Sequence, residues 1–234
     1  MRVIAIHGAA VNAAAWTPVQ RLLERTTTLI ADDLPGHGTR RAEPFVFATA
    51  VDEIVAAARN AGPGAVLVGE SLGGYLALAA AARLGRTIAG VVAGSCTFAM
   101  RGWAGRMARL SLPLGAMVPP AALRAILYRI CEPDVASEIE VRGLAPAMRN
   151  ETLRALIGYD VLADVRAVRV PIAFIVGGYD VPIVWNATRF ARAAAVGTVL
   201  VEPNAPHLLA VMRPAAFARA IVSIGSGNGD AELV

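Results

Sequence analysis

Six short apolar runs divide the chain, and each has the length of a buried β-strand. Between most of them, apolar residues recur at the three-to-four-residue spacing of an amphipathic helix. Alternating strands and helices predict an α/β fold with a mostly parallel sheet and helices on both faces. The predicted strands are Arg2–Ile6, Thr28–Ala31, Ala65–Val68, Ile88–Ala93, Ile172–Val176 and Thr198–Val201.

One stretch, residues 97–164, interrupts this alternation, because it contains helical patterns and several prolines but no good strand. We therefore predict a helical cap over residues 97–164, inserted into a core of residues 1–96 and 165–234. Trp103, Met107 and Leu110 of this stretch are candidates to line an apolar substrate pocket. The alternative is that they pack the cap onto the core, since apolar residues at helical spacing usually serve that purpose.

Composition excludes several classes of protein. All 22 basic residues are arginine, the net charge is +4, and the arginines are dispersed without a basic stripe, so we expect no nucleic-acid partner. Although 56% of the residues are hydrophobic, no run approaches the roughly 18 apolar residues of a membrane-spanning helix. The first residues lack the apolar segment of a signal peptide, so we expect a cytoplasmic protein. Cys96 and Cys131 do not have metal-ligand spacing, and we predict no metal site.

A short motif lies between the third predicted strand and the helix after it. Residues 69–73 read Gly-Glu-Ser-Leu-Gly, with an apolar run on each side. A strand, a tight turn with serine at its apex and a helix are the context of a nucleophile elbow. A serine hydroxyl is a weak nucleophile until a base takes its proton. Ser71 therefore requires a histidine and an acid further along the chain.

The scarcity of histidine narrows the choice of base. Of the three histidines, only His207 follows Ser71, and it comes just after the last predicted strand. Asp180 lies on the turn after the fifth strand, so the chain order is serine, aspartate, histidine, as in hydrolases with a nucleophile elbow. The carboxyl ends of parallel strands meet at one edge, where these side chains can come together. Competing acids are Asp160, Asp164 and Glu202.

Two backbone N–H groups are candidates for an oxyanion hole, which a tetrahedral intermediate requires. One is the N–H of Leu72, directly after the nucleophile and at a helix N-terminus. The other is the N–H of Ala9, because Gly8 permits a turn in the loop after the first strand. His37 precedes the nucleophile in another loop, and we interpret it as structural.

These motifs resemble those of the α/β-hydrolase superfamily, and the resemblance spans nearly the whole chain. It implies an α/β-hydrolase fold, a Ser-His-Asp hydrolase and a cap. Within the superfamily, the first two motifs are similar to those of small esterases and of bacterial relatives of plant methylesterases and hydroxynitrile lyases. The motifs are His7–Ala9, Asp33–Gly38, Gly69–Gly74, Gly178–Asp180 and Pro206–His207.

The chain departs from this superfamily in two places. Members often begin with an antiparallel hairpin, whereas Met1 here lies almost on the first strand, so we expect a reduced sheet of about six strands. Glu70 precedes the nucleophile, where His, Gln or Trp is frequent in relatives. We expect its carboxylate to point away from Ser71 and to hydrogen-bond the scaffold.

The favoured function is hydrolysis of a small, mostly apolar carboxylic ester or thioester through an acyl-enzyme on Ser71. The same triad is also compatible with carbon–carbon bond hydrolysis or cyanohydrin lysis, in which Arg101, Arg106 and Arg109 of the cap would hold a carboxylate. A third alternative is a hydrolase-fold receptor that binds a ligand without turnover. No cofactor is expected, because the loop after the first strand lacks the glycine fingerprint of a dinucleotide site. The expected partner is a small-molecule substrate, with oligomeric state and substrate identity left open.

Overall fold

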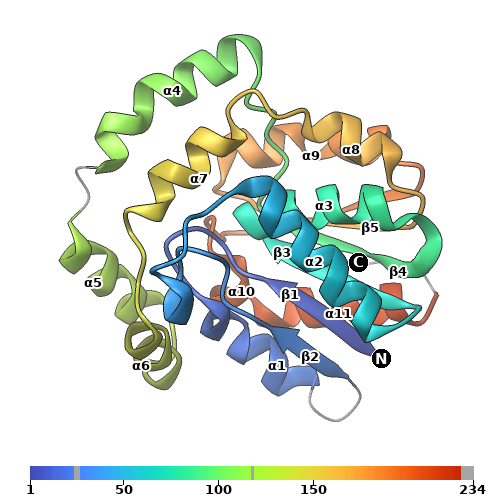
Figure 1. Cartoon of the computed structure of the whole chain (residues 1–234), viewed down its shortest axis with the longest axis horizontal. Helices are drawn as coiled ribbons and strands as arrows, with labels where there is room; N and C mark the ends of the chain where they lie inside the picture. Colours follow the sequence, from blue (N-terminus) through green and yellow to red (C-terminus); the bar gives the residue numbers. More distant parts are fainter. Residues whose placement is uncertain (24–26, 117–118, 228–234) are drawn as a thin grey trace.

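The computed structural model describes residues 1–23, 27–116 and 119–227, and it has one six-stranded sheet in which all paired strands are parallel (Figure 1). The strand order is β2-β1-β3-β4-β5-β6. This confirms the predicted α/β fold and the reduced sheet. The strands are β1 (Arg2–Ile6), β2 (Thr28–Ala31), β3 (Ala65–Glu70), β4 (Ile88–Gly94), β5 (Ile172–Gly177) and β6 (Gly197–Glu202).

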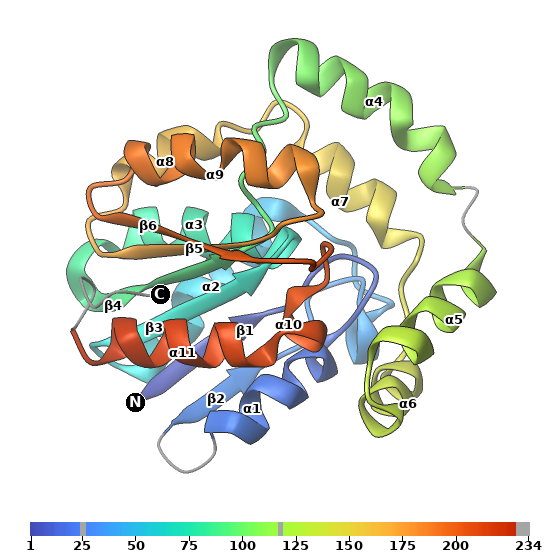
Figure 2. The ribbon, with the colours of Figure 1, turned by 180° about the vertical axis from the view of Figure 1, so that it is seen from behind.

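Helices cover both faces of the sheet, as Figure 2 shows from behind. On one face, α2 (Phe47–Ala61), α3 (Leu72–Leu84), α8 (Val161–Ala167) and α9 (Val181–Ala193) pack against the strands. On the other, α1 (Thr17–Leu23), α10 (Leu209–Met212) and α11 (Pro214–Gly225) form a second apolar cluster. Strands buried on both faces explain the continuous apolar runs of the sequence.

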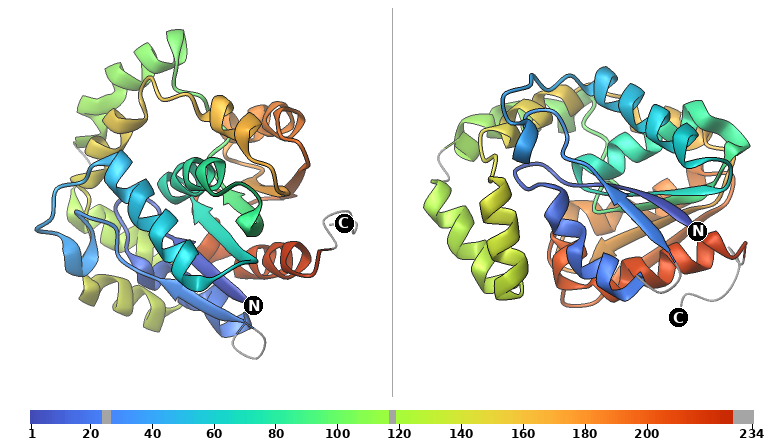
Figure 3. Two further views of the ribbon diagram at one scale, coloured as in Figure 1. Left: turned by 45° about the vertical axis from the view of Figure 1, so that its right-hand side comes forward. Right: turned by 60° about the horizontal axis from the view of Figure 1, so that its bottom comes forward.

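Four further helices lie beyond the C-terminal edge of the sheet, at the left of Figure 1. They are α4 (Gly102–Ala116), α5 (Pro120–Ile130), α6 (Pro133–Arg142) and α7 (Met148–Leu156). Figure 3 shows them standing apart from the two helical layers, whereas α8 packs on α3 in the main core. The helical nature of residues 97–164 agrees with the prediction, and their role as a separate cap stays a prediction. None of the helices described in residues 1–23, 27–116 and 119–227 is both long and apolar enough to cross a membrane.

Strand register brings the candidate chemistry to one edge. Ile6 at the end of β1 pairs with Gly69 of β3, and Gly69 pairs in turn with Ala93 of β4. On the other side of β4, Gly94 pairs with Ile175 of β5. The segments that follow these strands therefore leave the sheet side by side, which is where parallel sheets carry their ligand sites.

Candidate active site

Ser71 sits at the apex of the turn between β3 and α3. Its backbone has φ 55° and ψ −118°, in a region that side-chain-bearing residues rarely occupy. The N–H of Ser71 donates to the carbonyl oxygen of Gly94 at 2.8 Å, which holds the turn against β4. Such a strained serine between strand and helix has the geometry of the predicted nucleophile elbow.

Two glycines of the motif are required by close backbone approaches. A methyl group on Gly69 would lie 2.1 Å from the carbonyl oxygen of Gly73. A methyl group on Gly73 would lie 2.0 Å from the carbonyl oxygen of Ile6 at the end of β1. Neither position has room for a side chain, so the elbow packs tightly against the neighbouring strand.

The structure brings Ser71, His207 and Asp180 together. Nε2 of His207 lies 2.8 Å from Oγ of Ser71, and Nδ1 of His207 lies 2.5 Å from Oδ2 of Asp180. Asp180 directly precedes α9, and His207 lies on the loop between β6 and α10. With Nδ1–H donated to the carboxylate, the lone pair on Nε2 is free to accept the serine proton.

Two side chains anchor the loop that carries His207. Oγ of Ser95, just after β4, donates to the carbonyl oxygen of His207 at 2.8 Å. Oε1 of Glu70 accepts from the N–H of Leu209 and, at 3.0 Å, from that of Ala210. Glu70 thus bonds the scaffold as predicted. The contribution of Ser95 was missed, although its place directly after a strand is the signal that could have found it.

The electrostatics of the site follow from burial and from these partners. Burial alone would lower the pKa of His207, but the hydrogen bond and charge of Asp180, with the charge of Glu70, raise it above its usual value. Arg149 acts in the opposite direction. Burial raises the pKa of Glu70 to about 7, against the effect of its two N–H donors. Glu70 therefore titrates close to neutral pH, beside a histidine whose pKa its negative charge helps to raise.

A cleft of about 330 Å³ opens over these residues. Its lining is mostly apolar, and it also includes Ser71, Asp180 and His207. Most of the apolar lining was not predicted from the sequence; it includes Tyr75, Phe98, Met100, Leu153, Leu156 and Ile183. Such a cleft suits an apolar substrate with a few polar groups that orient it.

Comparisons with known proteins place the chain in a family. A family model described as "Alpha/beta hydrolase family" matches residues 3–220. The chain belongs to the alpha/beta hydrolase family. Over 81 residues, or 35% of its length, the chain is 41% identical to a pimeloyl-[acyl-carrier protein] methyl ester esterase of Xylella fastidiosa. The match spans 31% of that relative's length.

Solved structures resemble nearly the whole chain. A lipase-esterase related protein from Clostridium acetobutylicum has a TM-score of 0.77 at 18% identity, covering 95% of this chain and 93% of its own. The enol-lactonase from Burkholderia xenovorans has a TM-score of 0.75 at 16% identity, covering 96% and 91%. At these identities the likeness concerns the fold.

Three residues predicted for the substrate pocket do not line this cleft. Trp103, Met107 and Leu110 are 69%, 46% and 70% exposed, on the parts of α4 that face solvent. Helix α7 lines the cleft instead, through Leu153 and Leu156. The apolar pattern correctly predicted that α4 is a helix. Which of its faces meets the cleft depends on how the helix packs against the rest of the protein.

The loop after β1 brings Ala9 to the cleft beside Ser71 and Leu72. A methyl group on Gly8 would lie 3.5 Å from Cβ of Ser71, so this loop passes close to Ser71. Nε2 of His7 accepts from the N–H of Leu34 at 2.9 Å, and Nδ1 lies 2.8 Å from the carbonyl oxygen of Gly8. Burial lowers the pKa of His7 to about 3, so a neutral imidazole braces the loop.

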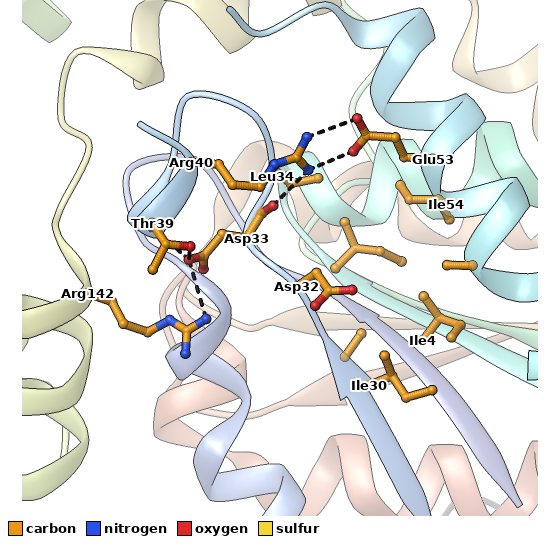
Figure 4. Close-up of a pocket in the computed structure, with 13 residues that line it drawn as sticks. Ile4, Ile30, Asp32, Asp33, Leu34, Thr39, Arg40, Glu53, Ile54 and Arg142 are labelled. Atoms are coloured by element: carbon orange, nitrogen blue, oxygen red, sulfur yellow. Dashed lines mark hydrogen bonds and ion pairs between the residues drawn. The ribbon is translucent and has the colours of Figure 1, made fainter. Parts of the chain in front are cut away.

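A hollow of about 260 Å³ lies beside β1 and β2 (Figure 4). Asp33 there accepts from the N–H of Ala13 and from Thr39, and it pairs with Arg142 of α6 at 3.4 Å. Although burial opposes it, these donors lower the pKa of Asp33 to about 2. The carboxylate of Asp33, which is charged at neutral pH, thus joins the segment after β2 to Ala13 and to α6.

The structure also shows the surroundings of His37 and of the two cysteines. His37 is buried, with Nδ1 2.9 Å from the carbonyl oxygen of Pro35, as suits a structural residue. Cys96 and Cys131 are buried free thiols. No group of three or more His, Cys, Asp or Glu side chains in residues 1–23, 27–116 and 119–227 is arranged to hold a metal ion.

Proposed function

We propose that the protein hydrolyses a small, mostly apolar carboxylic ester or thioester through a Ser71–His207–Asp180 triad. The observation that carries this proposal is the pair of contacts at His207, 2.8 Å to Ser71 and 2.5 Å to Asp180. Both lie within the reach that proton transfer requires. The partial similarity to a methyl ester esterase adds support for an ester substrate with a small alcohol.

In the first half-reaction, Nε2 of His207 takes the proton of Ser71 while Oγ attacks the substrate carbonyl carbon. The N–H groups of Ala9 and Leu72 stabilise the oxyanion. The imidazolium, stabilised by Asp180, then donates its proton to the leaving group, which is the alcohol oxygen of an ester or the thiol sulfur of a thioester. The acyl group remains as an ester on Ser71.

In the second half-reaction, His207 deprotonates a water molecule, and the resulting hydroxide attacks the acyl-enzyme. The tetrahedral intermediate collapses, the carboxylic acid leaves, and His207 returns the proton to Ser71. Each turnover consumes one ester or thioester and one water molecule, and no other reactant is required.

The test is a panel of carboxylic esters and thioesters of increasing acyl length, assayed with the wild type and Ser71→Ala. We expect turnover by the wild type and a loss of kcat on the order of 10⁶ in the variant. Turnover of cyanohydrins or β-diketones with none of any ester or thioester would contradict the proposal, as would full ester turnover by a folded Ser71→Ala.

A further inference from the structure

A second cavity, of about 430 Å³ and distinct from the hollow of Figure 4, lies beside the catalytic cleft. It is formed by the segment before α4, by α8 and by the outer part of α9. Its charged lining residues are Arg101, Asp160, Arg166 and Arg189. Three guanidinium groups and one carboxylate leave a net charge of +2 in this cavity.

The carboxylate of Asp160 is already occupied. Its Oδ2 forms an ion pair with Arg101, and its Oδ1 accepts from the N–H of Ala163, which caps α8. Arg166 and Arg189 have no carboxylate partner within residues 1–23, 27–116 and 119–227. Two guanidinium groups of the cavity are thus available to an anion.

The hollow of Figure 4 has the opposite arrangement. There Arg40 pairs with both Glu43 and Glu53, and Arg142 pairs with Asp33. Its arginines are satisfied within the protein and serve to join segments. Arg166 and Arg189 are exposed at the second cavity and form none of these ion pairs, so their charges are open to an anion from solvent.

The cavity adjoins the catalytic cleft. Phe98 lines both spaces, and the next two residues alternate, with Ala99 in the cavity and Met100 in the cleft. Phe98 also packs against the apolar cluster that contains Ile183 and Ala187 of α9. The two spaces therefore share Phe98 as part of their walls, and a chain-like substrate would have to cross this side chain to occupy both.

Helix α9 sets the scale of the distance. Its first turn borders the cleft, and Arg189, nine residues after Asp180, borders the cavity. At 1.5 Å per residue, Arg189 lies on the order of 13 Å along the helix from the acid of the triad.

We propose that this cavity binds a phosphate group carried by the substrate, on a spacer of roughly 10 Å from the bond that is cleaved. A phosphate monoester carries about −1.5 to −2 charges at neutral pH, which matches the net charge of the cavity. A carboxylate would leave one guanidinium unmatched. The planar forks of Arg166 and Arg189 suit the oxygens of such an anion. The proposal rests on the proposed ester or thioester hydrolysis.

Two matched substrate pairs test the site. One pair is the methyl ester of an ω-hydroxy acid of about ten carbons, with and without phosphate on the hydroxyl. The other is one acyl thioester of pantetheine and of phosphopantetheine. We expect the phosphorylated member of at least one pair to have a kcat/KM about tenfold to a hundredfold higher. The pair that responds shows whether the acyl part or the leaving thiol carries the phosphate.

The double variant Arg166→Gln/Arg189→Gln should bring that ratio close to one. The matched control is Arg192→Gln, which removes an exposed arginine of the same helix outside the cavity and should keep the ratio. Added salt should lower the preference, because exposed charges are screened. A ratio near one for both pairs in the wild type, or a stronger preference for an ω-carboxylate, would overturn the site.

A binding measurement separates this proposal from the proposed function. Calorimetry with hexyl phosphate on Ser71→Ala protein requires no turnover, and binding should be lost in the triple variant that also carries Arg166→Gln and Arg189→Gln. Binding without hydrolysis of any ester would retain the site and reject the proposed reaction. Ester hydrolysis with neither phosphate preference nor hexyl phosphate binding would do the reverse.

Discussion

The C-terminal edge of the sheet and helix α4 both contain many small and apolar residues, yet their side chains are held very differently. At the edge, Glu70 and Ser95 each bond the loop of His207, and Gly73 lies against the backbone of β1. On α4, Trp103 and Leu110 project into solvent. The comparison teaches that the chemical groups are positioned by backbone-scale contacts, whereas these two side chains of α4 are mostly exposed. Changes at the edge should therefore have much larger effects than changes on α4.

After the loss of the Ser71 hydroxyl itself, the largest effect at the edge is expected from Asp180→Asn. An amide cannot hold the Nδ1–H tautomer of His207 or stabilise its imidazolium, so kcat should fall by roughly 10⁴ with little change in stability. Steady-state kinetics on an ester substrate and thermal unfolding measure the two quantities. Glu202→Gln removes a competing acid that pairs with Arg219, and it should stay within a few-fold of the wild type. A larger loss from Glu202→Gln than from Asp180→Asn would reverse the assignment.

The next effect is on folding. Gly73→Ala places a methyl group 2.0 Å from a backbone oxygen of Ile6, and the strand or elbow must move. We expect the free energy of unfolding in urea to fall by about 3 kcal/mol. Gly8→Ala is the matched comparison, because its methyl group would meet its nearest neighbours at 3.4 Å and 3.5 Å, and it should unfold near the wild-type midpoint. Equal midpoints for the two variants would show that the edge is not tightly packed.

Glu70→Gln should change how stability depends on pH. Because burial raises the pKa of Glu70 from 4.5 to about 7, the folded state holds this proton while the unfolded state releases it. The wild type therefore loses stability relative to the variant as pH rises from about 5 to 8, by up to about 3 kcal/mol. Urea unfolding at several pH values measures this difference. A stability difference that does not change across this range would contradict the account of the buried carboxylate.

The same variant has a consequence for activity. The ionised Glu70 raises the pKa of His207, which must be neutral to act as a base. In the wild type, kcat/KM should rise with pH through a pKa above 6.5, and Glu70→Gln should move that rise to lower pH. If Glu70→Gln moved the rise of kcat/KM to higher pH, Glu70 would lower the pKa of His207 rather than raise it, which would contradict this account.

The smallest effect is expected on the cap. Trp103→Ala and Leu110→Ala remove exposed side chains, so each should change the free energy of unfolding by no more than about 0.5 kcal/mol. Their kcat/KM for a small ester should match that of the wild type. A marked loss of activity in either would show that α4 reaches the cleft after all and would weaken the contrast with the sheet edge.

The sequence was sufficient to predict the fold and the residues that meet at the edge. Apolar runs identify buried strands, and parallel strands bring Ser71, Asp180 and His207 to one side by topology alone. The prediction of His207 as the base left no alternative among the histidines, because only one histidine follows Ser71. Local patterns and chain order carry this information without any knowledge of tertiary packing.

The cap could not be predicted to the same depth. A helical pattern shows that α4 and α7 are helices, but both have apolar residues, and only docking decides that Leu153 lines the cleft and Leu110 does not. The bonds from Ser95 and Glu70 to the His207 loop join residues more than a hundred positions apart. Such pairings depend on where separate segments meet in space.

The most direct test of the central claim is covalent labelling of the nucleophile. Wild-type protein is incubated with a fluorophosphonate, and intact mass with peptide mapping locates the adduct. The account predicts one adduct, on Ser71, absent in Ser71→Ala and formed much more slowly in His207→Gln, which lacks the base. Folded protein that takes up no label, or that takes it up on another residue, would contradict it.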